Sequence, residues 1–122
     1  MKYYRIFNDS TGESHIDEIE VPQNNVNLPP PLLPIKSSEN YPSSSYNFVT
    51  FPKNWDGGWH LAPTKQFAIQ ISGIFEAESS DGKIIHLGPG EVCIMEDMMG
   101  KGHMSKNIGK GEAEILFIQV PK

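Results

Sequence analysis

The sequence is poor in cysteine and in basic residues, and both shortages exclude classes of protein. Its one cysteine, Cys93, cannot form an intramolecular disulfide framework or a multi-cysteine zinc ribbon. Lysine and arginine together number 10 against 15 aspartate and glutamate residues, which gives a formal net charge of −5. These basic residues form no run that could follow a phosphate backbone, so we expect no nucleic-acid partner.

Long apolar runs are also missing. No stretch approaches the roughly 18 apolar residues of a membrane span, so we expect no association with a membrane. The polar start, MKYYRIFNDS, has none of the organisation of a signal peptide. These features together predict a soluble, cytoplasmic protein.

No segment shows sustained helical periodicity, and short alternating segments typical of strands are found instead. Residues 67–72 place Phe67, Ile69 and Ile71 on one face and small or polar residues on the other. Asp81-Gly82 is a strong hairpin signal between expected strands at 74–78 and 83–87. About eight or nine such strands predict an all-β fold, closed or in two sheets, because strand edges need cover. The other expected strands cover residues 2–7, 15–21, 46–51, 59–61, 91–95 and 112–120.

The chain of 122 residues is long enough for one core but too short to divide, so we expect a single domain over residues 1–122. Residues 1–45 supply N-terminal strands and a proline-rich segment, and residues 46–120 supply the barrel core. Six of the 10 prolines fall between residues 22 and 45, which excludes a central strand there.

Within this proline-rich segment, residues 28–34 are expected to run as extended polyproline-type chain. Leu32, Leu33 and Ile35 would then pack onto a face of the barrel or onto a second subunit. The alternative is that the segment serves as a proline-rich ligand for another protein.

Two histidines beside strands carry the main functional signal. The first motif is Trp59-His60-Leu61-Ala62-Pro63, followed by Gln66 and Gly73. The second motif begins at Gly90 and continues through Glu96-Asp97 to the glycine-rich loop that ends at His103. Asn107 follows four residues later. This pattern resembles the two motifs of the cupin superfamily. Ala62 replaces the second histidine of the first motif, and Gln66 replaces its glutamate. The resemblance covers about residues 46–120 and implies a cupin-type double-stranded β-helix, or jelly-roll, barrel.

The resemblance also implies a metal site and a homodimer. In a typical cupin, three histidines and one glutamate hold a divalent iron, zinc, manganese or nickel ion. Carried over residue by residue, this ligand set leaves His60, Gln66 and His103. Glu96 or Asp97 could restore a carboxylate ligand, and either could act as the catalytic acid or base.

The ligand pocket is expected around His60. If the apolar face of residues 67–72 points inward, Gln66 faces out, unless Pro63 introduces a bulge. We favour the alternative, in which the small polar face with Gln70 lines the cavity. Trp55 and Trp59 would wall the mouth of the barrel or seal its end, and Lys65 would attract a carboxylate on the ligand. His15 and His86 are expected at the surface or in hydrogen bonds, and Cys93 as a buried apolar residue.

Three functions are compatible with these residues. The first is a small-molecule-binding cupin that acts as a divalent-metal-dependent enzyme of the oxygenase, isomerase or lyase type. The second is a metal-free ligand-binding or sensing cupin without catalytic activity. The third is a structural dimer in which the proline-rich segment crosses to the partner subunit.

Overall fold

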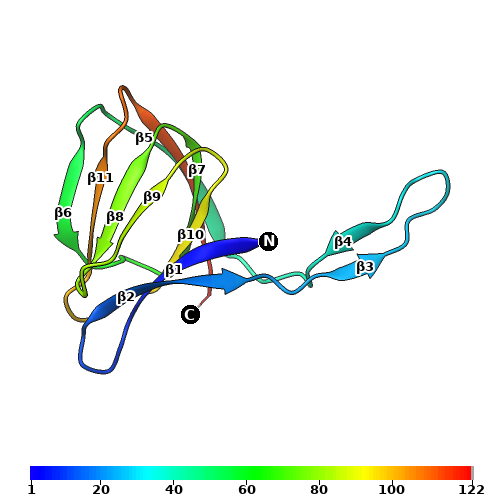
Figure 1. The fold of residues 1–122 in the computed structure, drawn as a ribbon, viewed down its shortest axis with the longest axis horizontal. Coiled ribbons are helices and arrows are strands. Elements are labelled where there is room, and N and C mark those ends of the chain that lie inside the picture. Colours follow the sequence, from blue (N-terminus) through cyan, green and yellow to red (C-terminus); the bar gives the residue numbers. More distant parts are fainter. Residues whose placement is uncertain (122) are drawn as a thin grey trace.

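The computed structural model describes residues 1–121, which form strands and loops only (Figure 1). Twelve strands are found among these residues, in a six-stranded sheet, a four-stranded sheet and a separate two-stranded hairpin. The predicted all-β fold is therefore confirmed. None of these residues belongs to a helix long and apolar enough to span a membrane.

The six-stranded sheet has the order β2-β1-β10-β7-β12-β5. β1 and β10 pair in parallel, and the other neighbours pair antiparallel. Strands distant in sequence are thus adjacent in space, as expected of a barrel built by crossing connections. The strands are β1 (Lys2–Asn8), β2 (Ser14–Glu20), β5 (Ser45–Phe51), β7 (Gln66–Ser72), β10 (Val92–Met95) and β12 (Ala113–Gln119).

The four-stranded sheet has the order β6-β11-β8-β9 and packs against the larger sheet. Its strands are β6 (Asp56–His60), β8 (Phe75–Ser79), β9 (Ile84–Leu87) and β11 (His103–Asn107). The core between the sheets contains Ile6, Ile16, Phe75, Leu87 and Ile115, all buried. Burial of this apolar surface is the main source of stability for a two-sheet domain of this size.

β7 presents its small and polar face to the interior. Gln66, Ala68 and Gln70 are buried, whereas Ile71 is exposed on the opposite face. The inward orientation of the small polar face, which we favour of the two arrangements, is confirmed, but the expectation that Gln70 lines the cavity is not. The outward apolar face is covered in part by Tyr3, which packs edge-on against Phe67.

The predicted secondary structure is wrong in two places. No strand was expected directly after the glycine-rich loop that ends at His103, but His103 begins β11, which pairs with both β6 and β8. Residues 28–34 form no polyproline-type chain. They connect β3 (Asn24–Val26) and β4 (Ile35–Ser37) through a turn, closed by a hydrogen bond from the Leu32 amide to the Pro29 carbonyl.

The loop before β11 approaches the end of β6 so closely that it requires a glycine. Gly102 has a φ of +72°, and a Cβ on it would lie 2.2 Å from the carbonyl oxygen of His60. The buried Ser14 hydroxyl donates to the Gly102 carbonyl at 2.6 Å and accepts from the Ser80 amide at 2.7 Å. These bonds fasten the start of β11 to both sheets.

A methyl group at Gly102 should therefore be costly. We expect Gly102→Ala to destabilise the fold by about 3–5 kcal/mol, because backbone displacement adds to the cost of a left-handed conformation. Gly58→Ala is the matched control. Gly58 has a φ of +60° with nothing within 4 Å of its added Cβ, and we expect a loss of only about 1–2 kcal/mol there. Urea denaturation measures both, and equal losses would contradict the steric argument.

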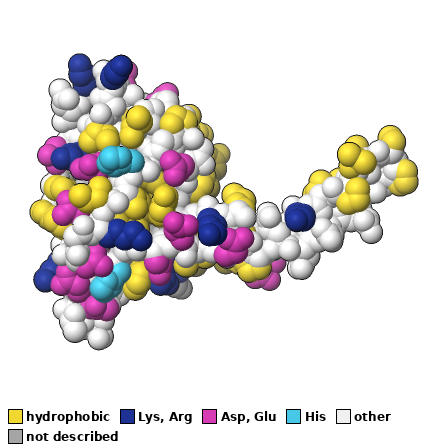
Figure 2. All heavy atoms as spheres, viewed as in Figure 1, with side chains coloured by type: hydrophobic (Ala, Val, Ile, Leu, Met, Phe, Trp, Pro, Cys, Tyr) yellow, Lys and Arg dark blue, Asp and Glu magenta, His cyan; other side chains and the backbone are white. Residues whose placement is uncertain are grey.

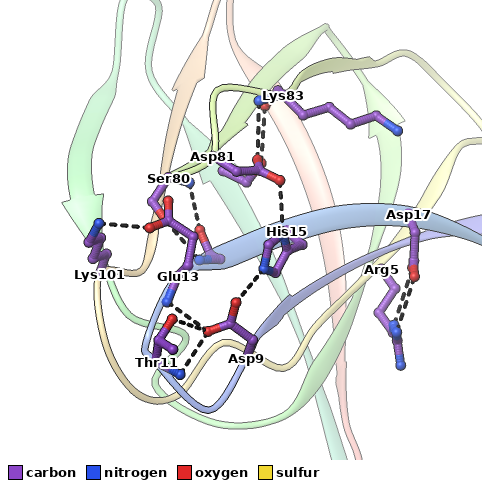
Figure 3. Close-up of polar contacts among 12 residues, drawn as sticks. Arg5, Asp9, Thr11, Glu13, His15, Asp17, Ser80, Asp81, Lys83 and Lys101 are labelled. Carbon is purple, nitrogen blue, oxygen red and sulfur yellow. Dashed lines mark hydrogen bonds and ion pairs between the residues drawn. The ribbon is translucent and has the colours of Figure 1, made fainter.

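A cluster of charged side chains ties the β1–β2 hairpin to the β8–β9 turn (Figure 3). His15 lies between two carboxylates, with Nε2 at 2.7 Å from Asp9 Oδ2 and Nδ1 at 2.9 Å from Asp81 Oδ2. Beside it, Glu13 accepts a 2.7 Å bond from Lys101. Because both ring nitrogens of His15 face carboxylates, only the imidazolium can donate to both. The expectation that His15 and His86 form hydrogen bonds is confirmed, since His86 bonds Glu76.

The hydrogen bonds of His15, first to Asp9 and then to Asp81, raise the pKa of its imidazole. The Asp9 carboxylate bonded to His15 has its pKa held well below its usual range. A raised folded-state pKa stabilises the fold fully below the unfolded value of about 6.5, and this stability is lost as pH rises through the folded-state pKa. On the acid side, the contribution of Asp9 is lost as the pH falls below the unfolded pKa of about 3.9.

We therefore expect the melting temperature of the parent protein to fall as the pH is raised above about 6.5, the unfolded pKa of histidine. In His15→Gln this pH dependence should be smaller, because the titrating cation is gone. His86→Gln, which removes a histidine with one carboxylate partner, is the control and should retain the fall. Thermal unfolding of the three proteins at each pH is the measurement. An unchanged fall in His15→Gln would show that another group titrates.

Candidate functional site

A pocket of about 290 Å³ lies between the two sheets, and we call it the inner pocket. Most of its wall is aromatic or aliphatic, with Phe51, Trp55, Phe75 and Phe117 as the largest members. Phe51 packs edge-on against Trp55, Phe75 and Phe117, which holds these rings in place. Concave, mostly apolar pockets with a few polar groups are the usual form of small-molecule sites.

His60, the last residue of β6, supplies one polar group of the inner pocket. Its Nδ1 lies 2.9 Å from the carbonyl oxygen of Gly58. A carbonyl oxygen only accepts, so Nδ1 carries the proton. In the neutral ring Nε2 then has a free lone pair.

His103, the first residue of β11, supplies the second polar group. It pairs with His60 across the antiparallel ladder, and the ring centroids are 4.6 Å apart. The residue is only 1% exposed, and its Nδ1 lies 2.6 Å from Oδ2 of Asp97. The structure thus brings together the two histidines that the sequence marked as candidate ligands.

Asp97 lies behind His103 and away from the inner pocket. It is 0% exposed, and its backbone carbonyl accepts a bond from the Ala62 amide at 3.1 Å. Within residues 1–121, its Oδ1 has no hydrogen-bond partner. A carboxylate on Nδ1 fixes the tautomer and the orientation of the ring, which leaves Nε2 as the acceptor. Asp97 is therefore a positioning residue for His103 and does not reach the inner pocket itself.

Gln66 lines the inner pocket, but its carbonyl oxygen is already used. Oε1 accepts a 2.8 Å hydrogen bond from Nε2 of Gln119. That same Gln119 nitrogen donates to Asn47 at 3.0 Å, so a chain of amides crosses β7, β12 and β5. The amide of Gln66 is part of the sheet framework rather than a free oxygen donor.

These contacts decide how well the residues fit the metal that the resemblance implies. In the part of the chain that the structure describes, no group of three or more histidine, cysteine, aspartate or glutamate side chains is arranged to hold a metal ion. The donors that remain in the inner pocket are two imidazoles, and no aspartate or glutamate is among the described residues that line it. This set does not fit the ligand pattern of three histidines and one glutamate. The predicted divalent metal stays a prediction.

Four expected site residues lie elsewhere. Trp59 is 52% exposed, because alternation along β6 turns it away from His60. Gln70 is buried, but its amide donates to the Ser72 carbonyl and it does not line the inner pocket. Lys65 and Glu96 form an ion pair at 3.3 Å on the outer face of the larger sheet. Glu96 alternates with Asp97, so only Asp97 points toward His103.

The aromatic wall was largely missed from the sequence. Trp55 was considered only as a wall of the mouth or a seal of the barrel end, and it packs against the core and lines the inner pocket. Phe51 and Phe117 end up on one wall because β5 and β12 are neighbours in the sheet. Alternation identifies which residues share a face, but the pairing of strands decides which faces meet.

No family model matches this chain, and no curated protein matches it. Among solved structures, the cupin domain of Cnp3 from Schizosaccharomyces pombe is similar at a TM-score of 0.52 and 12% identity, over 89% of this chain and 73% of that one. A cupin 2 conserved barrel domain protein from Leptotrichia buccalis has a TM-score of 0.49 and 13% identity, over 98% and 73% of the two chains. A cupin domain from Bordetella pertussis has a TM-score of 0.48 and 16% identity, over 70% and 100%.

At these identities the similarity concerns the fold alone, and it rests on the match to the yeast domain. That match agrees with the two packed sheets and with the all-β topology described above. The chain therefore has the fold of a small cupin-type jelly-roll barrel.

Proposed function

We propose that this protein binds a small, neutral, single-ring molecule in the inner pocket, without a metal, through a hydroxyl group that faces His60 and His103. One observation carries the proposal. Two adjacent imidazoles, each anchored through Nδ1, share one wall of a pocket that is otherwise mostly apolar. Each anchored neutral ring leaves Nε2 as an acceptor for a hydrogen bond from the ligand.

The size and charge of the inner pocket support this class of ligand. A volume of about 290 Å³ is at the lower end of the range for small-molecule sites, which is suited to a single ring. No lysine or arginine is among the described residues that line it, so a ligand carboxylate would have no cationic partner. Lys65, expected to attract such a carboxylate, is paired with Glu96 on the outer face. A neutral hydroxyl is favoured over an anion for this reason.

The Asp97–His103 pair also suits proton transfer. A histidine whose Nδ1 is held by a carboxylate can accept a proton at Nε2 from a bound hydroxyl, with Asp97 stabilising the imidazolium that forms. The proposal for binding does not depend on this step. It requires only that Nε2 accept a hydrogen bond.

Paired compounds test the binding proposal. We expect phenol to raise the melting temperature more than benzene, because only phenol can donate to the imidazoles. In His60→Ala and in His103→Ala, the affinity for phenol should fall roughly 5–100-fold, as a lost hydrogen bond with an unpaired partner costs about 1–3 kcal/mol. Thermal shift and ligand-observed NMR would measure this, with His86→Ala as the surface control. Equal binding of phenol and benzene, or binding unchanged in both histidine variants, would refute the role of the imidazoles.

Metal content tests the competing, metal-dependent function. We expect mass spectrometry of the untagged protein to find no stoichiometric metal, even after exposure to iron, zinc, manganese and nickel, because two neutral imidazoles without a carboxylate make a weak site. Stoichiometric metal in the parent protein that is lost in both His60→Ala and His103→Ala would contradict the proposal. It would establish the metal-dependent cupin in its place.

A further inference from the structure

Residues 22–45 form an arm that leaves the barrel between β2 and β5 (Figure 1). Its two strands, β3 and β4, pair only with each other, from Asn24 opposite Ser37 to Val26 opposite Ile35. All three residues of β3 are exposed. A two-stranded hairpin without a third strand or a packed face is marginally stable in water. The arm therefore lacks a packing surface within its own chain.

The end of the arm is apolar. Leu33 is 82% exposed and Leu32 is 61% exposed, and the apolar Val26 and Ile35 nearby are exposed as well. Figure 2 shows hydrophobic side chains gathered at the far end of the arm, away from the barrel. Isolated exposed leucines are common, but an apolar cluster on a projecting hairpin is typical of an interaction surface.

The chain also carries an apolar surface that fits such an arm. A groove of about 490 Å³ on the outer face of the six-stranded sheet, which we call the outer groove, is lined mainly by apolar side chains, including Tyr3, Phe67 and Ile94. The two ends of the arm also line it, through Val21 and Pro22 on one side and Tyr41 and Pro42 on the other. The outer groove thus lies at the root of the arm.

An arm cannot fill the groove at its own root in this arrangement, since its leucines lie at the opposite end of the hairpin (Figure 1). The arm of a second copy of the chain can reach this groove. If the two arms run antiparallel, the end of each lies at the root of the other, and both grooves are filled by one twofold operation. The two equivalent contacts would then both contribute to the buried area, which for a specific interface is about 1,200–2,000 Å² in total.

We propose that the protein is a homodimer in which each arm packs Leu32 and Leu33 into the outer groove of the partner. The two-stranded arms have free edges, so their antiparallel contact can also add backbone hydrogen bonds between copies. The chemistry of the contact is apolar on both sides, which matches the leucines to the groove. This assignment does not depend on the ligand of the inner pocket.

Light scattering coupled to gel filtration tests the proposal on the full chain. We expect the parent to elute with the mass of two 13.6 kDa chains and the double variant Leu32→Asp, Leu33→Asp to elute as a monomer. Tyr41→Asp, which places a charge in the groove at an exposed position, should also give a monomer. Ile84→Asp is the matched control, because Ile84 is exposed on β9 of the other sheet, and it should remain dimeric. Near-ultraviolet circular dichroism checks that every variant is folded.

Mixing the variants gives a sharper test. The arm of Tyr41→Asp and the groove of the double leucine variant are both intact, so an equimolar mixture should recover dimers through one of the two contacts. A monomeric parent at every concentration would overturn the proposal. A parent dimer that survives both sets of substitutions would overturn it too, since the copies would then associate through another surface, and so would the failure of the mixture to recover any dimer.

Discussion

The close approach of Gly102 to the His60 carbonyl is the contact on which the site depends. Only a residue without a Cβ can bring the two backbones this near, and the Ser14 hydroxyl then holds the Gly102 carbonyl from the other side. His103 follows Gly102 directly, so the same contact places its ring opposite His60 in the ladder. The glycine-rich segment therefore holds the start of β11 against the end of β6. It sets the separation of the two imidazoles before any ligand arrives.

The polar end of the inner pocket is buried more deeply than its function as a hydrogen-bonding site requires. Asp97 is fully enclosed and one of its oxygens lacks a partner in the described chain, which is a costly arrangement for a carboxylate. Such a cost is tolerated where the group holds a neighbour in a fixed orientation, and here the neighbour is His103. Apolar rings line the other walls, and a hydrogen bond formed at Nε2 in such surroundings is stronger than in bulk water.

Much of the fold could be predicted from the sequence, and less of the site. The alternation of Phe67, Ile69 and Ile71 located β7, and the structure confirms its polar inner face. β11 was missed because Met-Ser-Lys after His103 has few strand-forming side chains, and its pairing with two neighbours compensates. Trp59 and Lys65 were expected in the pocket but lie outside it. Motif spacing shows which residues are near a histidine in sequence, but it does not predict toward which face of the sheet their side chains point. The proximity of His60 and His103 followed from the family resemblance alone.

The order of strands in the larger sheet also governs how this chain can fold. β12 is formed by residues 113–119, yet it lies between β7 and β5, and β1 pairs with β10 from the other end of the sequence. Until β12 is in place, β5 has no neighbour in that sheet and its apolar side chains stay in water. Non-local pairing of this kind makes folding slow, because the entropy of closing long loops is lost before the stabilising contacts form. During synthesis on a ribosome, the larger sheet cannot be completed until residue 119 has left the exit tunnel, so β5 and β7 keep open edges until then.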